Sequence, residues 1–216
     1  MQPNLAQVLN TLAHEIRTPL AVSQGYLKLY LDGRLTNVDD TRRAFEQTRQ
    51  ALGTLATLCV DRGKVSTLSE SAALGIPEHV SAADFVTSVR ALSELEGVTW
   101  SGDPGARALE TTNHRDLAQA VAIVSKAAFD EARDQPHSIR TESGDGLIVL
   151  AGANDSLDAL QAGPGAPGAK PVDFVKGGKG LKLIWAAFVL DRHQVQTWTA
   201  AEHRASVGFR FPLVKA

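Results

Sequence analysis

The sequence predicts a helical hairpin that pairs with a second copy into a dimeric four-helix bundle, followed by an α+β sandwich domain. Two observations support this division. Apolar residues recur at steps of three and four along residues 4–31 and again along residues 39–65, which is the spacing of long amphipathic helices. From residue 80 onward, short helical and strand-like segments alternate and are separated by glycine-containing turns.

Both helices of the hairpin carry apolar or small residues along one side. These residues are Leu5, Leu9, Leu12 and Ile16 in the first helix, and Phe45, Thr48, Leu52, Leu55 and Cys59 in the second. The segment between the helices, residues 32–40, contains Gly33 and Asn37 and predicts a turn. Because a single hairpin cannot cover its own apolar stripe, we expect a second copy of the chain to complete the bundle.

A small, polar segment at residues 67–79 is predicted to link the hairpin, residues 1–66, to the α+β domain, residues 80–216. The residue patterns of this domain predict three helices over one mixed sheet. The helices are expected over 82–95, 113–132 and 181–193, the strands over 98–101, 106–110, 137–143, 146–152, 195–200 and 205–213, and a long loop over 153–180. Asn113 can cap the second helix, with Asp116 in the capping-box position.

The composition argues against several classes of function. The formal net charge of the 216 residues is −2, so no general basic surface for nucleic acid is expected. The single cysteine, Cys59, excludes an internal disulfide and favours a reducing compartment, so we expect a cytoplasmic location. The chain shows no apolar run long enough to span a membrane and no recognisable signal peptide. The spacing of the histidines predicts no metal site.

The segment LAHEIRTPLAV, residues 12–22, places a titratable side chain within an apolar helix. His14 lies two residues from both Leu12 and Ile16, which puts it about 200° around the helix from each of them. We therefore expect His14 to point toward water, with Thr18 one turn further along the same face. Pro19 removes a backbone donor and is expected to bend or loosen the helix nearby.

The residues alone allow two interpretations of His14. In the first, it is an ordinary surface histidine. In the second, it is a nucleophile, because a neutral imidazole attacks phosphorus readily near pH 7. The carboxylate of Glu15 can then hold one ring nitrogen protonated while the other nitrogen attacks. Thr18 can hold a water molecule for the hydrolytic reaction. The local spacing does not decide between the two interpretations.

The heptapeptide HEIRTPL, residues 14–20, resembles the phosphoacceptor box of bacterial two-component sensor histidine kinases. In that family, the box lies in the first helix of a two-helix hairpin, as it does here. The family histidine is phosphorylated and passes the phosphoryl group to an aspartate of a response regulator. The following residue assists as a base, and the threonine four residues on serves phosphatase activity. The resemblance implies these catalytic roles for His14, Glu15 and Thr18.

Residues 80–213 resemble the ATP-binding domain of the same family in the order of their elements, but the nucleotide motifs are degenerate. In the family helix that holds Mg-ATP, two asparagines are replaced here by Ile123 and Ala127. Alanine offers no oxygen ligand to Mg²⁺. Ala151 stands where the family aspartate bonds the adenine amino group, although a shifted alignment would place Asp155 there.

The last nucleotide motif survives in part as GKGLKL, residues 178–183. Gly178 and Gly180 remain as the weak remnant of a nucleotide-binding loop, and Lys182 replaces a glycine. A glycine pair in this place is also typical of a simple loop-to-helix turn. Without the metal-binding residues, the chain lacks the bound Mg²⁺ that would neutralise the charge of the phosphates. We therefore expect no cofactor and no autophosphorylation by ATP.

Three hypotheses for the function follow. In the leading one, the chain is a homodimeric pseudokinase in a two-component phosphorelay, and its His14 relays phosphoryl groups to or from an aspartate of a response-regulator receiver domain. The group comes from the regulator or from an active histidine kinase. Arg17, Lys28, Arg42 and Arg43 can together meet an acidic regulator surface. In the second hypothesis, the chain is an active sensor kinase that uses ATP and Mg²⁺ through divergent motifs. In the third, it is a non-catalytic scaffold that binds a regulator or a true kinase.

Overall fold

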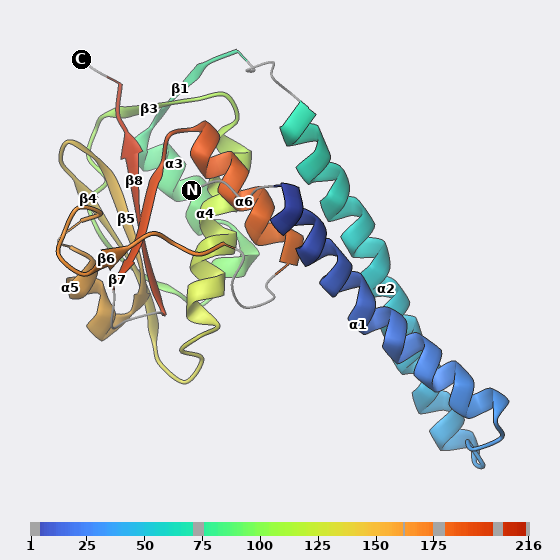
Figure 1. Ribbon diagram of the computed structural model, residues 1–216. Coiled ribbons are helices and arrows are strands. Elements are labelled where there is room, and N and C mark those ends of the chain that lie inside the picture. Colours follow the sequence, from blue (N-terminus) through green and yellow to red (C-terminus); the bar gives the residue numbers. More distant parts are fainter. Residues whose placement is uncertain (1–4, 71–75, 162, 175–179, 201–204, 215–216) are drawn as a thin grey trace.

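The computed structural model describes residues 5–70, 76–161, 163–174, 180–200 and 205–214 (Figure 1). It contains a long helical hairpin and an α/β unit that packs against one half of that hairpin. The fold class predicted for the chain is confirmed, because a helical hairpin precedes a unit of helices on a mixed sheet.

The hairpin consists of α1 (Leu5–Leu31) and α2 (Val38–Glu70). α1 continues as one helix through Pro19. Gly33 follows the end of α1 in the left-handed conformation, with φ of +65°, which glycine adopts without steric cost. Asn37 caps α2, because its side-chain oxygen accepts a hydrogen bond from the backbone N–H of Asp40 at 2.7 Å. α2 extends beyond residue 65, where the sequence pattern predicted its end.

The two helices leave most of their large apolar side chains outside their mutual contact. The residues of the hairpin that are buried within the single chain include Pro19, Ser23, Ala44, Thr48, Ala51 and Leu58. By contrast, the predicted seam residues Leu9, Ile16, Phe45 and Leu52 are between 37% and 54% exposed. The hairpin therefore has an inner face of mostly small residues and a separate, exposed face of large ones. The sequence pattern predicted a single seam that contained residues of both faces.

The main sheet of the α/β unit has six strands in the order β2-β4-β5-β8-β7-β6. β2 runs parallel to β4, and the other neighbouring pairs are antiparallel. These strands are β2 (Thr99–Gly102), β4 (His137–Ser143), β5 (Gly146–Ala153), β6 (Ala169–Lys170), β7 (Gln196–Ala200) and β8 (Ser206–Pro212). A separate two-stranded sheet pairs β1 (Glu78–Ser81) with β3 (Ala108–Thr111).

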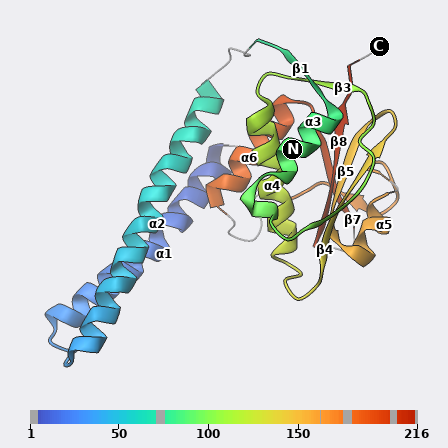
Figure 2. The ribbon, with the colours of Figure 1, turned by 180° about the vertical axis from the view of Figure 1, so that it is seen from behind.

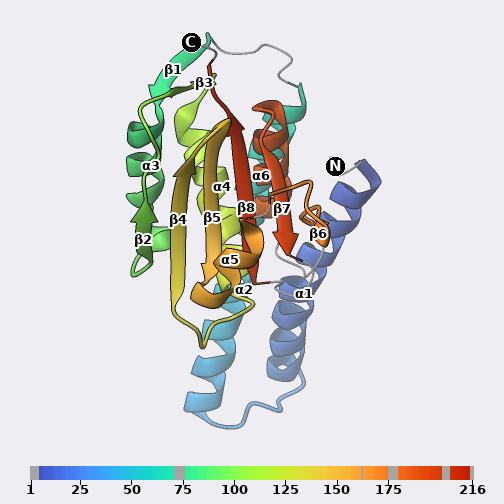
Figure 3. The same cartoon turned by 90° about the vertical axis from the view of Figure 1, so that its left-hand side faces the viewer.

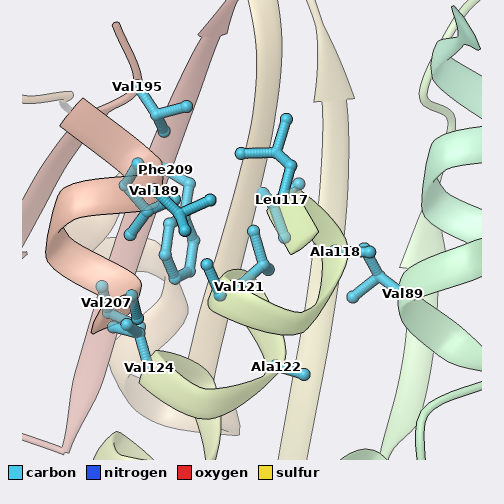
Figure 4. Close-up of a cluster of buried hydrophobic side chains, with 14 of the residues drawn as sticks. Val89, Leu117, Ala118, Val121, Ala122, Val124, Val189, Val195, Val207 and Phe209 are labelled. Atoms are coloured by element: carbon cyan, nitrogen blue, oxygen red, sulfur yellow. The ribbon is translucent and has the colours of Figure 1, made fainter. Parts of the chain in front are cut away.

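Helices cover the main sheet unequally on its two faces (Figure 3). The larger core lies beneath α3 (Ala82–Arg90), α4 (His114–Phe129) and α6 (Gly180–Arg192) and includes Val149 and Ala151 of β5. The intervening Leu150 belongs to a smaller cluster on the opposite face, with the short helix α5 (Leu157–Leu160). Figure 4 shows α4 in the larger core, with Val121 and Val124 packed toward α6 and β8.

Capping interactions fix the start of the central helix α4. The predicted N-cap is present, since Asn113 Oδ1 accepts a hydrogen bond from the backbone N–H of Asp116 at 3.1 Å. The capping box is incomplete, because the backbone N–H of Asn113 donates to Thr111 Oγ1 rather than to the Asp116 carboxylate. Glu78 Oε1 accepts a second hydrogen bond from the backbone N–H of His114 at 3.0 Å and lies 2.8 Å from its Nδ1. These hydrogen bonds hold the pKa of Glu78 below its ordinary value. They tie the first strand of the α/β unit to α4.

The elements differ from the sequence-based expectation in three places. The segment 153–180, predicted as a loop, contains the 3-10 turn η2 (Asn154–Ser156), α5 and β6. The helix predicted over 82–95 is divided into α3 and the 3-10 turn η1 (Ser93–Leu95). The single mixed sheet predicted for the domain is divided, because β3, near the strand predicted at 106–110, pairs with β1 in a separate sheet while β2 joins β4 in the main sheet. Strand pairing depends on contacts that are distant in sequence, which local alternation does not specify.

We expect Gly208→Ala to lower the free energy of unfolding by about 1–3 kcal/mol, because the site is already filled. A Cβ at Gly208 in β8 would overlap the Trp198 indole. That indole is buried, and its Nε1–H donates to the Leu160 carbonyl at 3.1 Å, so the ring is held in place. The measurement is urea-induced unfolding. Gly144→Ala is the control, since a Cβ there has no atom within 4 Å, and equal stabilities of the two variants would contradict the expectation.

Candidate functional site

His14 and Thr18 are both exposed on α1, one helical turn apart. Leu12, two residues before His14, is half-buried, and Pro19 is buried. The structure thus places His14 on the accessible side of the helix, in the orientation predicted from its spacing. Glu15 differs from His14 and Thr18, because its side chain is half-buried and turns toward the α/β unit.

The side chain of Glu15 reaches the first residue of α6. A Cβ built on Gly180 would lie 2.8 Å from Glu15 Oε2 and 3.2 Å from Glu15 Cδ, and real Cβ atoms do not approach other atoms as closely as 2.8 Å. Gly180 also has φ of +79°, where other residues are strained. Glycine at residue 180 therefore allows Glu15 to keep this position. Gly178, the other predicted remnant of the nucleotide loop, lies outside the described residues.

Apolar contacts hold α6 against the hairpin. Leu58 of α2 is buried and belongs to the same cluster as the core of the α/β unit, and Val8, Leu12 and Leu55 pack against that cluster. Figure 2 shows α6 between α4 and the hairpin. One continuous apolar cluster thus joins the hairpin to the α/β unit. The contact between Glu15 and Gly180 lies at this junction.

The electrostatics of Glu15 reflect its position at the junction. Burial raises the pKa of the Glu15 carboxyl above its ordinary value, and the neighbouring His14 acts in the opposite direction. The partial positive charge at the N-terminus of a helix acts in the same direction as His14, and burial is the larger effect on the pKa of Glu15. The site therefore combines an accessible imidazole with a partly desolvated carboxyl group on the adjacent residue.

Apolar side chains occupy the positions at which the resemblance places nucleotide-binding residues. Ile123 and Ala127 of α4 are half-buried and pack against the larger core, and Ala151 of β5 is fully buried. The side chain of Asp155 lies outside the part of the chain that the structure describes. Within that part, no group of three or more His, Cys, Asp or Glu side chains is arranged to hold a metal ion.

The exposed half of the hairpin carries two further features. Arg17, Lys28, Arg42 and Arg43 are all exposed, as contact with an acidic partner requires. Large apolar side chains are exposed as well, and they include Leu20, Leu27, Tyr30, Phe45 and Leu52. The rings of Tyr30 and Phe45, on the two different helices, lie 5.3 Å apart. These apolar residues form a surface that we call the outer face of the hairpin.

Two contacts could not be predicted from the sequence: Glu15 lies beside Gly180, and Leu58 joins the core of the α/β unit. Both contacts join residues that are far apart in the chain. The local signal for the first was a glycine at the start of a helix, a residue type that helix interiors disfavour. That signal indicated a special backbone conformation, but not the side chain that uses the space.

Comparisons with known proteins agree with this geometry. Residues 4–61 match the His Kinase A (phospho-acceptor) domain family. The histidine kinase AdeS of Acinetobacter baumannii has a similar structure, with a TM-score of 0.60 and 16% sequence identity over 94% of this chain and 98% of that chain. Full-length ShkA in complex with AMPPNP has a TM-score of 0.52 and 18% identity, over 96% of this chain and 46% of ShkA. No curated protein matches the sequence significantly.

The hairpin thus matches a phospho-acceptor domain family, and the chain shares the fold of the histidine kinases AdeS and ShkA. These findings confirm the resemblance to the two-component sensor histidine kinase family. The chain spans about half the length of ShkA. No helix among the described residues is long and apolar enough to cross a membrane.

Glu15→Gln removes the titratable group while keeping the size of the side chain. Because the folded-state pKa of Glu15 is raised, the stability of the wild type is highest below the ordinary value of 4.5 and falls as the pH rises through the folded-state pKa. The glutamine side chain does not titrate. We therefore expect the variant to melt at a higher temperature than the wild type at pH 7 and at the same temperature near pH 4, as measured by calorimetry.

Glu46→Gln is the matched control for this experiment. Glu46 lies on the exposed surface of α2, and the hydrogen bond from Arg49 holds its pKa below the ordinary value. Its removal should lower the melting temperature at pH 7 slightly or leave it unchanged. If Glu15→Gln and the wild type have the same melting temperature at every pH, burial does not raise the pKa of the Glu15 carboxyl group.

Proposed function

We propose that this chain is a phosphotransfer protein of two-component signalling, in which His14 accepts a phosphoryl group from a partner and relays it to or from an aspartate of a response-regulator receiver domain. The supporting observation is the combination of two features. An intact HEIRTPL box exposes its histidine on α1, while Ile123 and Ala127 fill the positions at which a kinase would hold Mg-ATP.

The proposed transfer needs only groups that the chain and the regulator supply. The lone pair of one ring nitrogen of neutral His14 forms the N–P bond, and the P–O bond to the regulator aspartate breaks. That aspartate leaves as a carboxylate with the electron pair of the broken bond. The second ring nitrogen then releases its proton to the Glu15 carboxylate or to water. The reverse sequence returns the phosphoryl group to an aspartate.

Thr18 has a separate role in this proposal. Its hydroxyl lies one turn from His14 on the exposed face of α1, where a receiver domain docked on the hairpin would bring its aspartyl phosphate. A water molecule held by Thr18 attacks phosphorus, and the P–O bond to the aspartate breaks. The products are inorganic phosphate and the aspartate carboxylate. The same face of the hairpin thus serves both transfer and hydrolysis.

We also propose that two copies of the chain pair through the outer face of the hairpin. Its exposed side chains include Leu20, Leu27, Tyr30, Phe45 and Leu52, and burying them against an equivalent face gives a four-helix bundle. The residues that α1 and α2 bury within one chain are not needed for this contact. The basic residues Arg17, Lys28, Arg42 and Arg43 then face the regulator, which we expect to be acidic at its docking surface.

We expect His14→Ala to abolish phosphoryl transfer from a phosphorylated receiver domain or an active histidine kinase, with labelling reduced by about 100-fold or more, because the nucleophile is lost. The measurement is incorporation of radiolabelled phosphate into the chain. His79→Ala, which removes another exposed histidine, should label like the wild type, and with Thr18→Ala the aspartyl phosphate of the receiver domain should persist longer. Equal labelling of His14→Ala and the wild type would contradict the relay and favour a non-catalytic scaffold.

We expect Mg-ATP to leave the melting temperature within about 1 °C of the value with Mg²⁺ alone. A ligand at 100 times its Kd would stabilise the folded state by about 2.7 kcal/mol, which is easily measured. The reason for the expectation is that the side chains of Ile123 and Ala127 provide no oxygen for the metal ion. The fold shared with ShkA, which was solved with AMPPNP, makes this test necessary. A clear stabilisation followed by labelling of His14 from ATP would identify an active kinase instead.

A further inference from the structure

We infer that Gly180 is a positioning residue for phosphoryl transfer at His14, because it leaves the space beside the first turn of α6 in which the Glu15 carboxylate lies. The inference rests on the proposed function of His14. It assigns to the α/β unit a part in the reaction that requires no nucleotide, namely to fix the group that receives the proton of the imidazole.

The Glu15 carboxylate lies close to Gly180. Glu15 Oε2 lies 2.8 Å, and Glu15 Cδ 3.2 Å, from the point where a Cβ of residue 180 would be. A methyl group there would have to displace the carboxylate. Since α1 is a continuous helix around Glu15, this displacement would come from rotation of the side chain or from separation of α6 from the hairpin.

The second support is that packing on both sides limits such a separation. α6 is buried along most of its length in the larger core, and Leu12 and Leu55 of the hairpin pack against the same cluster. Leu12 lies one turn before Glu15 on α1. The junction therefore has little freedom to adjust, and the position of Gly180 relative to Glu15 is determined by the docking of the α/β unit.

The third support is that the adjacent residues His14 and Glu15 have different surroundings. His14 is exposed and remains accessible to a receiver domain, whereas Glu15 faces α6. A carboxylate that is free in water samples many rotamers, and a base must be held in place to accept a proton efficiently. The packing of Glu15 beside Gly180 limits the positions open to its side chain and leaves His14 uncovered.

The test compares Gly180→Ala with Gly97→Ala. Both glycines have nearly the same positive φ, +79° and +78°, at which an alanine would be strained. A Cβ at Gly97, however, has no atom within 4 Å. Gly97→Ala therefore reproduces the backbone strain without the steric overlap. We expect Gly180→Ala to slow transfer from a phosphorylated receiver domain to His14 by about 10-fold or more, as part of the effect of a positioned base is lost. Gly97→Ala should transfer at the wild-type rate.

A double-mutant cycle then separates positioning from a structural effect. If Gly180 acts through Glu15, the change Gly180→Ala should alter the transfer rate less than about 2-fold when Glu15→Ala has already removed the carboxylate. Melting temperatures of all variants establish that they are folded. Additive effects of the two substitutions, or equal rates for Gly180→Ala and the wild type, would overturn the inference.

A second measurement does not require phosphoryl transfer. Carbon-13 NMR titration of the Glu15 carboxyl should show its pKa moving toward the ordinary value in Gly180→Ala, because the displaced group is better hydrated, and remaining raised in Gly97→Ala. His14, which acts electrostatically to lower the pKa of Glu15, is unchanged in both variants. A wild type that takes no label at His14 would refute the proposed relay, whereas an unchanged Glu15 titration in Gly180→Ala would refute the positioning role alone.

Discussion

The arrangement of this chain depends on one constraint: two long helices have more apolar surface than they can bury against each other. Within the single chain, the helices bury small residues such as Ser23, Ala44 and Ala51. Toward one end of the hairpin, α6 covers additional apolar surface around Leu12 and Leu58. The large side chains of the outer face remain uncovered. The hairpin therefore requires two further partners, and the α/β unit of the same chain is the first of them.

The same constraint determines where the reactive groups lie. Successive residues of a helix point about 100° apart, so His14 and Glu15 cannot share the same surroundings. Once α6 packs against Leu12, the next turn of α1 presents Glu15 to the first residue of α6 and leaves His14 and Thr18 exposed. The docking of the α/β unit thus creates different environments for two adjacent side chains, as the proposed roles of His14 as nucleophile and Glu15 as base require.

The sequence was informative where structure depends on local patterns. Periodicity and turn residues predict the helices of the hairpin, the N-cap at Asn113 and the hairpin of β4 and β5. The sequence was uninformative where structure depends on distant contacts. Neither the pairing of β1 with β3 nor the placement of α5 on the opposite face of the sheet has a local signal. The exposed orientation of His14 could be predicted, whereas the contact between Glu15 and Gly180 could not.

The core of the α/β unit explains how its fold accommodates apolar residues at Ile123 and Ala127. Its interior consists of apolar contacts between α4, α6 and the sheet, and Ile123 and Ala127 add to these contacts. Polar ligands at the same two positions would serve a metal ion but would contribute less apolar packing. Their replacement therefore costs the fold nothing in apolar burial, and it leaves the docking of α6 on the hairpin intact. If docking is what Glu15 requires, the proposed function gives the α/β unit a part in phosphoryl transfer that needs no nucleotide.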